Sequence, residues 1–235
     1  MKSLLALIFL FLSGNLLAQD TVTHKGKFAL TGMLMNVNGQ SQSVFNYDFN
    51  HNAKYKKYDV TFSSNWMLSY KDGTKTQDDN SVRLQPRFVA NNWSLFTFGQ
   101  VSRAFSRKLD NRVEAGFGGG HNIIKGKWYT ITGSYAIMYD NSNYANGSEI
   151  KALRHSPRLQ FFGDIKNVSF FTEGFFQPMT DNFDNYNYRT TVEIKYNVNK
   201  KLSLISSYKR WYETYNVMGT KGLIENFTIG TTFSY

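Results

Sequence analysis

The stretch "YNYRTTVEIKYNV", residues 186–198, alternates between two kinds of side chain at every step. One parity collects tyrosines and aliphatic residues and the other collects polar and charged ones: Tyr186, Tyr188, Thr190, Val192, Ile194, Tyr196 and Val198 against Asn187, Arg189, Thr191, Glu193, Lys195 and Asn197. A helix would mix these two sets, whereas a strand sends successive side chains to opposite faces. The stretch therefore predicts a β-strand with one apolar face and one polar face.

Two further stretches, residues 58–70 and 128–139, show the same alternation. In each of them, aromatic residues stand at both ends of the apolar face and aliphatic residues stand in the middle. A β-sandwich would also alternate, but it gives no reason for Tyr and Trp at both ends of a strand. The aromatic girdles of an outer-membrane β-barrel do give one. A polar lumen also explains how 17% aromatic residues coexist with a mean hydropathy of −0.42.

The alternation predicts an all-β fold: a transmembrane, antiparallel, up-and-down β-barrel of about twelve strands. We expect strands near residues 26–37, 42–51, 57–70, 81–91, 93–105, 111–124, 128–139, 149–162, 167–178, 186–198, 202–214 and 223–235. Connections after even-numbered strands are short, and most of those after odd-numbered strands are longer and more polar, such as "KDGTKTQDDN" and "DNSNYANGS". Short periplasmic turns and longer outer loops are typical of bacterial barrels.

The chain opens with "MKSLLALIFLFLSGNLLAQD", in which a single Lys precedes an apolar run and Ala18 offers a cleavage position. This arrangement is typical of a secretory signal peptide, and the run is too short for a membrane anchor. We therefore expect residues 1–18 to be a signal peptide and residues 19–235 to form the barrel. The last strand ends in Phe233 and Tyr235. Outer-membrane barrels resemble one another here, and the resemblance implies a signal for the barrel assembly machinery.

The glycine-rich stretch "EAGFGGGHN", residues 114–122, is similar in composition to a phosphate-binding loop. Such a loop leaves a strand and enters a helix, but here a "KGK" turn and another aromatic strand follow. Gly116, Gly118 and Gly120 instead take the lumen parity of the expected sixth strand. We expect them to clear space for large side chains from opposite walls and to let the strand bend.

The parity rule predicts a charged inner wall. Its members are Arg83, Arg87, Arg112, Glu114, Arg154, Arg158, Glu173, Arg189, Glu193, Lys195, Lys209 and Glu213. Parity is ambiguous in the fifth strand, where Phe96 and Phe98 compete with Trp93 and Leu95, and it is weaker in the eighth, where His155 falls on the outward set.

Two hypotheses follow for this inner wall. Acids and arginines could pair across the lumen and plug it, giving a closed barrel that binds a ligand or partner through its outer loops. Alternatively, "VRLQPRF" and "RHSPRLQ", each with two arginines four residues apart, would line a narrow pore that favours small anionic solutes. Twelve strands lie between a filled interior and an aqueous channel, so the sequence leaves both hypotheses open.

The sequence argues against several other functions. His155 and Ser156 are adjacent on a strand and point to opposite faces, so they cannot form a nucleophile–base pair, and we predict no enzymatic activity. No metal site, other cofactor site or cysteine motif is predicted. The formal net charge of +10 does not indicate nucleic-acid binding in an exported chain without a basic helix. Lys and Arg at the outer rim are better suited to lipopolysaccharide phosphates beside the membrane lipid.

The segment 110–162 carries a resemblance to a known family. "DNRVEAGFGGGHNII", an aromatic strand and "ALRHSPRLQFF" together resemble the YdiY-like family of salt-induced outer-membrane proteins, a domain of unknown function. The matching positions are Asp110, Arg112, Gly116, Gly118, Gly120, Arg154, Ser156 and Arg158. The resemblance implies an outer-membrane barrel and no established activity.

Overall fold

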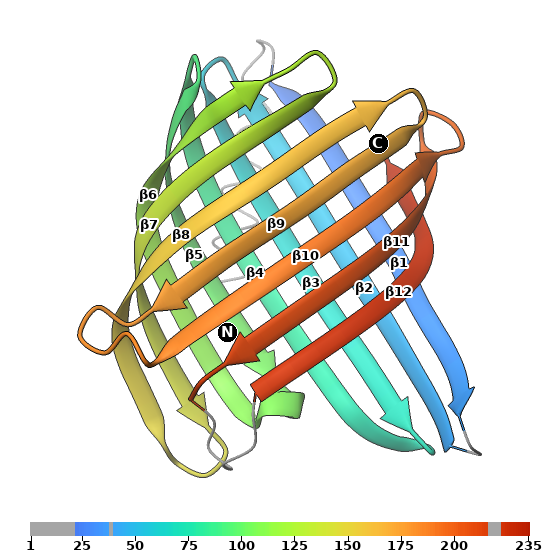
Figure 1. The fold of residues 1–235 in the computed structure, drawn as a ribbon, viewed down its shortest axis with the longest axis vertical. Coiled ribbons are helices and arrows are strands. Elements are labelled where there is room, and N and C mark those ends of the chain that lie inside the picture. Colours follow the sequence, from blue (N-terminus) through green and yellow to red (C-terminus); the bar gives the residue numbers. More distant parts are fainter. Residues whose placement is uncertain (1–21, 38–39, 216–221) are drawn as a thin grey trace.

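The computed structural model describes residues 22–37, 40–215 and 222–235, and they form a closed barrel of twelve antiparallel strands (Figure 1). The predicted fold class is thus confirmed. The strands are β1 (Thr23–Val37), β2 (Gln40–Tyr55), β3 (Tyr58–Lys71), β4 (Thr74–Ala90), β5 (Trp93–Ala104), β6 (Leu109–Lys125), β7 (Tyr129–Tyr144), β8 (Glu149–Ile165), β9 (Val168–Pro178), β10 (Tyr186–Asn197), β11 (Leu202–Glu213) and β12 (Gly222–Ser234). A 3₁₀ turn, η1 (Phe105–Arg107), stands between β5 and β6. Residues 1–18, predicted to be the signal peptide, lie outside the described residues.

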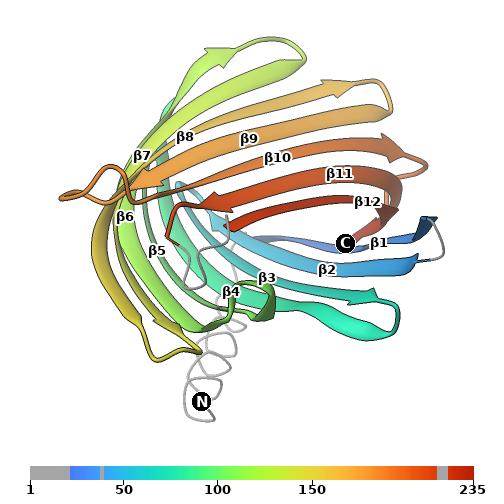
Figure 2. The same ribbon diagram turned by 60° about the horizontal axis from the view of Figure 1, so that its bottom comes forward.

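Each strand pairs with its neighbour in sequence, and β12 returns to pair with β1. This closing seam runs from Lys27 opposite Ser234 to Gly32 opposite Ile229, and it is the shortest ladder of the barrel. We call the end that carries the connections after even-numbered strands the turn end, and the opposite end the loop end; the turn end is uppermost in Figure 1. Figure 2 brings the loop end forward and shows the strands enclosing an interior.

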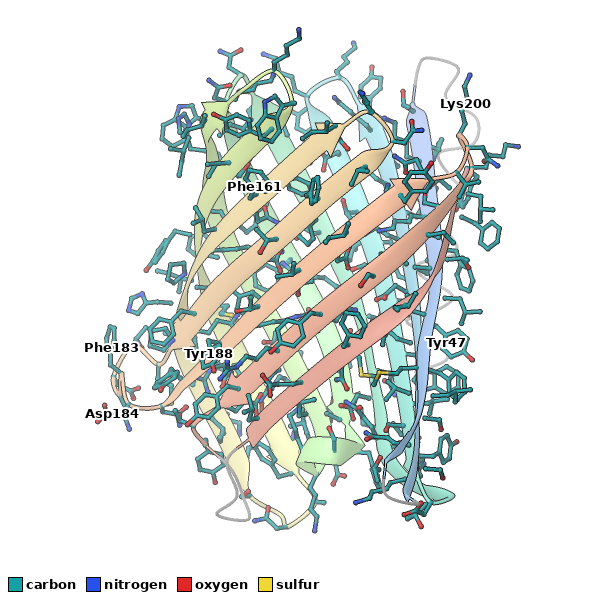
Figure 3. All side chains as sticks on the ribbon, turned by 45° about the vertical axis from the view of Figure 1, so that its right-hand side comes forward. Tyr47, Phe161, Phe183, Asp184, Tyr188 and Lys200 are labelled. Carbon is teal, nitrogen blue, oxygen red and sulfur yellow. The ribbon has the colours of Figure 1, made fainter. Side chains whose placement is uncertain are left out.

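The two faces of the barrel wall have opposite chemistry. Most side chains that are buried in the described residues are polar or charged, and they point into the lumen. Large apolar side chains such as Leu84, Phe117 and Ile229 are exposed on the outside. Aromatic residues of the outer face are present toward both ends, with Tyr47 and Tyr188 nearer the loop end and Phe161 nearer the turn end (Figure 3). This distribution suits a barrel surrounded by lipid.

The parity predicted for residues 186–198 holds in β10, where Asn187 and Thr191 are buried and Val192 and Ile194 are exposed. The structure also settles the ambiguous fifth strand. Phe98 is buried in the lumen, whereas Leu95 is exposed on the outside. The side chains of β5 could not decide this alone, because both of its faces carry aromatic residues.

The hairpins of the loop end differ from the expected long loops. Strands β3 and β4 continue to a two-residue turn, Asp72–Gly73, so "KDGTKTQDDN" is mostly strand. Both turn residues have positive φ, 49° and 76°, as a type I′ turn requires. Strand β7 likewise extends to Tyr144. Polar residues there continue the backbone ladder, because strand pairing needs no apolar face beyond the membrane. The predicted loop "NVMGTKG" lies largely outside the described residues.

The lumen glycines serve neighbouring strands rather than opposite walls, and in this respect our expectation was wrong. A Cβ on Gly118 would stand 2.2 Å from the backbone oxygen of Tyr135 on β7. A Cβ on Gly116 would stand 2.8 Å from the Phe98 ring on β5. The bare backbone of β6 therefore lets β7 approach closely and lets the Phe98 ring lie against the wall.

We expect Gly118→Ala to lower the free energy of unfolding by about 1–3 kcal/mol, because the added methyl group meets backbone that cannot move aside. Gly174→Ala is the matched control, since nothing lies within 4 Å of the Cβ position at Gly174. Urea unfolding of the refolded barrel in detergent micelles measures both variants. Equal stability of the two variants would contradict the close approach at β6.

Candidate functional site: the lumen

The lumen holds a cavity of about 970 Å³, which we call the chamber. Its wall reaches from Asn91 and Asn92, in the turn between β4 and β5, to Gln177 and Trp211 toward the loop end. The side chains of Lys27 and Arg87 on this wall are 39% and 42% exposed. The chamber is therefore a wide, solvent-accessible space that extends from the turn end into the middle of the barrel.

Two arginines face the chamber without a carboxylate within salt-bridge distance among the described residues. The Arg83 guanidinium lies 4.2 Å from the centre of the Phe98 ring and donates to Gln85 Oε1 at 2.9 Å. The Arg189 guanidinium lies 5.5 Å from the centre of the Trp211 ring. An aromatic face holds a guanidinium in place without neutralising its charge. Both arginines therefore keep positive charge available to a solute in the chamber.

Most other charged groups of the chamber wall form ion pairs, but Glu114 forms none among the described residues. Arg87 binds Asp59 through two nitrogens, with its Nη2 2.9 Å from Oδ2, and Arg158 binds Glu173. Lys27 lies 3.9 Å from Glu193. These pairs join neighbouring or nearby strands, so they hold the wall together while neutralising most of their own charge.

At the loop end, a buried network joins nearly opposite walls of the barrel. We call Arg107, Arg112, Asp140, Arg154 and Glu213 the brace. Glu213 Oε1 accepts from Arg107 Nη1 at 2.6 Å and from Arg112 Nη1 at 2.7 Å. Asp140 bridges the other two arginines, with distances of 3.4 Å to Arg112 Nε and 2.8 Å to Arg154 Nε. Because Arg112 is on β6 and Glu213 is on β11, the brace crosses the lumen and narrows it.

A second cavity, of about 100 Å³, continues beside the brace toward the loop end, and we call it the narrow passage. Asn65, Ser81, Gln100, Arg189 and Trp211 line both cavities, so the two are adjacent. Four charged side chains point into the narrow passage. Arg189, Lys209 and Asp79 have the lumen parity of their strands, and Arg107 comes from η1. Lys209 lies 3.3 Å from Asp48, and Asp79 accepts from Ser106 and Gln77.

The twelve sequence-predicted lumen residues are distributed over four locations. Seven line the chamber: Arg83, Arg87, Glu114, Arg158, Glu173, Arg189 and Glu193. Three belong to the brace: Arg112, Arg154 and Glu213. Lys209 lines the narrow passage, and Lys195 is half-buried near the turn end. Their role in a pore stays a prediction.

Sequence reasoning missed several residues of the lumen. Asp140 and Ser142 continue the alternation of residues 128–139, and a longer seventh strand would have included them. Asp59 had the correct parity, and its pairing with Arg87 follows from the register, in which the two residues are direct partners. Arg107 carried no signal, because it lies in η1 between strands, where side-chain direction does not follow parity.

The remaining candidate chemistry is spread over the two faces. His155 lies outside, where its Nδ1 contacts the Tyr135 hydroxyl, and Ser156 lies inside, where its Oγ is 3.3 Å from Gln177 Nε2. Among the described residues, no group of three or more His, Asp or Glu side chains is arranged to hold a metal ion. In the same part of the chain, no helix is long and apolar enough to span a membrane.

The structure resembles solved outer-membrane barrels. The NanC porin superposes with a TM-score of 0.55 at 10% identity, over 90% of this chain and 99% of that one. The KdgM porin gives 0.46 at 9% identity, over 90% and 99%. The translocator domain of the autotransporter NalP from Neisseria meningitidis gives 0.46 at 12%, over 100% and 95%. The chain thus shares its β-barrel fold with the NanC porin. No protein-family model and no curated protein sequence matches the chain.

We expect Glu213→Gln to destabilise the barrel by about 3–5 kcal/mol, because Arg107 and Arg112 would lose their shared carboxylate in a buried site. Glu149→Gln is the matched control, since Glu149 pairs with Lys151 at the surface and such pairs contribute about 0–1 kcal/mol. Equilibrium unfolding in detergent measures both variants. Similar losses in the two would argue against a stabilising brace.

Proposed function

We propose that the protein is a narrow outer-membrane pore that favours small anionic solutes. The observation that carries the proposal is the pair Arg83 and Arg189, which face a solvent-accessible chamber with aromatic rings behind them and no carboxylate within salt-bridge distance among the described residues. Both side chains are half-buried, so each guanidinium is partly desolvated without an ionic partner, and an anionic solute would supply that partner. Arg158 and its partner Glu173 are both close enough to interact electrostatically with Arg83 and Arg189.

The charge along the lumen supports a preference for anions. Around the brace and the narrow passage, five cationic side chains face four carboxylates, an excess of one positive charge: Arg107, Arg112, Arg154, Arg189 and Lys209 against Asp48, Asp79, Asp140 and Glu213. A narrow, low-dielectric constriction focuses the field of its charges, so this part of the lumen has the strongest influence on which ions pass. A volume of about 100 Å³ holds several water molecules but no large solute. Small anions are therefore the solutes that we infer.

The second candidate is a closed, non-conducting barrel that acts through structure or through loop-mediated binding of a ligand or partner. The brace is the observation that favours it, because Arg112 and Glu213 meet across the lumen at the loop end and narrow it there. The two candidates differ in whether the narrow passage carries ions. Neither of them involves catalysis or a bound cofactor.

Single-channel recording in a planar bilayer with a salt gradient tests the pore. We expect discrete conductance steps and a reversal potential that reports anion preference. In Arg83→Gln and Arg189→Gln, the ratio of anion to cation permeability should fall by up to roughly fivefold, since a charge at about 4 Å in water contributes about 1 kcal/mol.

Arg210→Gln is the matched control for these recordings. This substitution removes the same charge, but the Arg210 side chain lies on the outer face of β11, 3.7 Å from Glu225 and over the Tyr188 ring. Its selectivity should equal that of the unmodified protein. A folded barrel that gives no steps would contradict the pore and favour the closed barrel. Conductance steps whose ion selectivity is unchanged in both Arg83→Gln and Arg189→Gln would contradict the role proposed for these two arginines.

We also propose the cellular setting of the barrel. Residues 1–18 would direct export, Phe233 and Tyr235 would engage the barrel assembly machinery, and basic residues at the outer rim would contact lipopolysaccharide. The resemblance of segment 110–162 further suggests a relationship to the YdiY-like family.

We expect the protein expressed in a Gram-negative cell to fractionate with the outer membrane. Intact-mass measurement should show a chain that begins at Gln19, because Ala18 precedes the expected cleavage position. Ala18→Arg should leave the precursor uncut. A full-length chain in the inner membrane would contradict the proposal.

A further inference from the structure

Two histidines and the C-terminal tyrosine meet on the outer surface of the closing seam, at the turn end. His24 is on β1, His51 is on β2 and Tyr235 follows β12. His24 Nδ1 lies 3.2 Å from His51 Nε2, and His51 Nδ1 lies 3.2 Å from the Tyr235 hydroxyl. The proposed pore uses none of these side chains, because all three have the outward parity of their strands.

The backbone holds this cluster in place. Gly26 and Tyr235 exchange two backbone hydrogen bonds, each 3.0 Å long. The Tyr235 ring lies directly over Gly26, where a Cβ would stand 1.9 Å from it. Only glycine leaves room for the ring at this position, and the ring in turn reaches His51, which pairs with Gly26 in the ladder between β1 and β2.

The hydrogen bonds of His51 favour a ligand arrangement. If its Nδ1–H donates to the Tyr235 hydroxyl, its Nε2 carries a lone pair directed at His24 Nδ1. A partner on the second ring nitrogen is the usual device that fixes the tautomer of a metal-binding histidine. Two nitrogens bound to one metal at 2.0–2.1 Å in tetrahedral geometry lie about 3.3 Å apart. The observed 3.2 Å is close to this spacing, so the rings need only rotate, without moving apart, for both lone pairs to converge on one ion.

We propose that His24 and His51 form a surface site for a divalent transition-metal ion, with Tyr235 orienting His51. Imidazole nitrogen suits Cu²⁺, Zn²⁺ and Ni²⁺, and Cu²⁺ binds most tightly in the usual order of stability. Water completes the coordination, because His24 is exposed. The bound ion would link β1 to β2 beside the shortest ladder of the barrel and so stabilise the folded state.

Cu²⁺ titration of the untagged, refolded chain without its proposed leader tests the site. We expect one-to-one binding by calorimetry and an electron paramagnetic resonance spectrum with two nitrogen ligands. His24→Ala and His51→Ala should each abolish the one-to-one isotherm. Tyr235→Phe keeps both ligands but removes the partner of His51 Nδ1, so its affinity should fall about 10- to 100-fold.

His121→Ala and His155→Ala are the matched controls, because each removes one outward histidine elsewhere on the barrel. Both should bind Cu²⁺ like the unmodified protein. In both, the ion should raise the temperature at which the barrel unfolds, which is followed by the change in its electrophoretic mobility on heating. Binding that survives in His24→Ala and His51→Ala, or that is absent from the unmodified protein, would overturn the site. In the latter case the two histidines share a proton only.

Discussion

Closure of the sheet is the constraint on which the rest of the structure depends. In hydrocarbon, every backbone N–H and C=O must find a partner within the protein, and a barrel achieves this only when its first and last strands pair. The ladder between β1 and β12 provides this pairing. Once the sheet is closed, alternate residues of every strand face either the lipid outside or the lumen inside. The outer face must therefore be apolar, whereas the inner face can carry charge.

The lumen uses that freedom in three ways. Arg87 and Arg158 pair with acids on neighbouring strands and join the wall. Arg112 and Arg154 belong to a brace that spans the interior. Arg83 and Arg189 rest on aromatic rings, which position a guanidinium without neutralising it. The same residue type is thus neutralised in an ion pair or keeps its charge, according to whether a carboxylate or an aromatic ring lies beside it.

Much of the fold could be predicted from the sequence, because a period of two fixes both strand and face. The alternation of residues 186–198 placed Asn187 and Thr191 inside, and both are buried. The extents of β3 and β4 could have been read from the Asp72–Gly73 pair, a strong hairpin signal, but the polar composition around it indicated a loop.

The alternation of side chains could not predict which residues meet when their strands are far apart in the sequence. That Arg112 meets Glu213 rather than its neighbour Glu114 depends on the register and section of the closed barrel. The contribution of Arg107 depends on the path of η1, which no periodicity describes. The lumen glycines were assigned to the correct face but to the wrong partners, because close approach of adjacent backbones leaves no mark in a sequence.

The position of Glu213 near the end of the chain bears on the order of events during folding. Arg107, Arg112 and Arg154 all precede it by more than fifty residues, and until β11 docks Asp140 is the only carboxylate of the brace available to them. An incomplete barrel therefore holds an excess of positive charge that needs water around it. Arrival of the last hairpin supplies the missing countercharge and the closing ladder together, so charge neutralisation inside the lumen and completion of the wall become a single step.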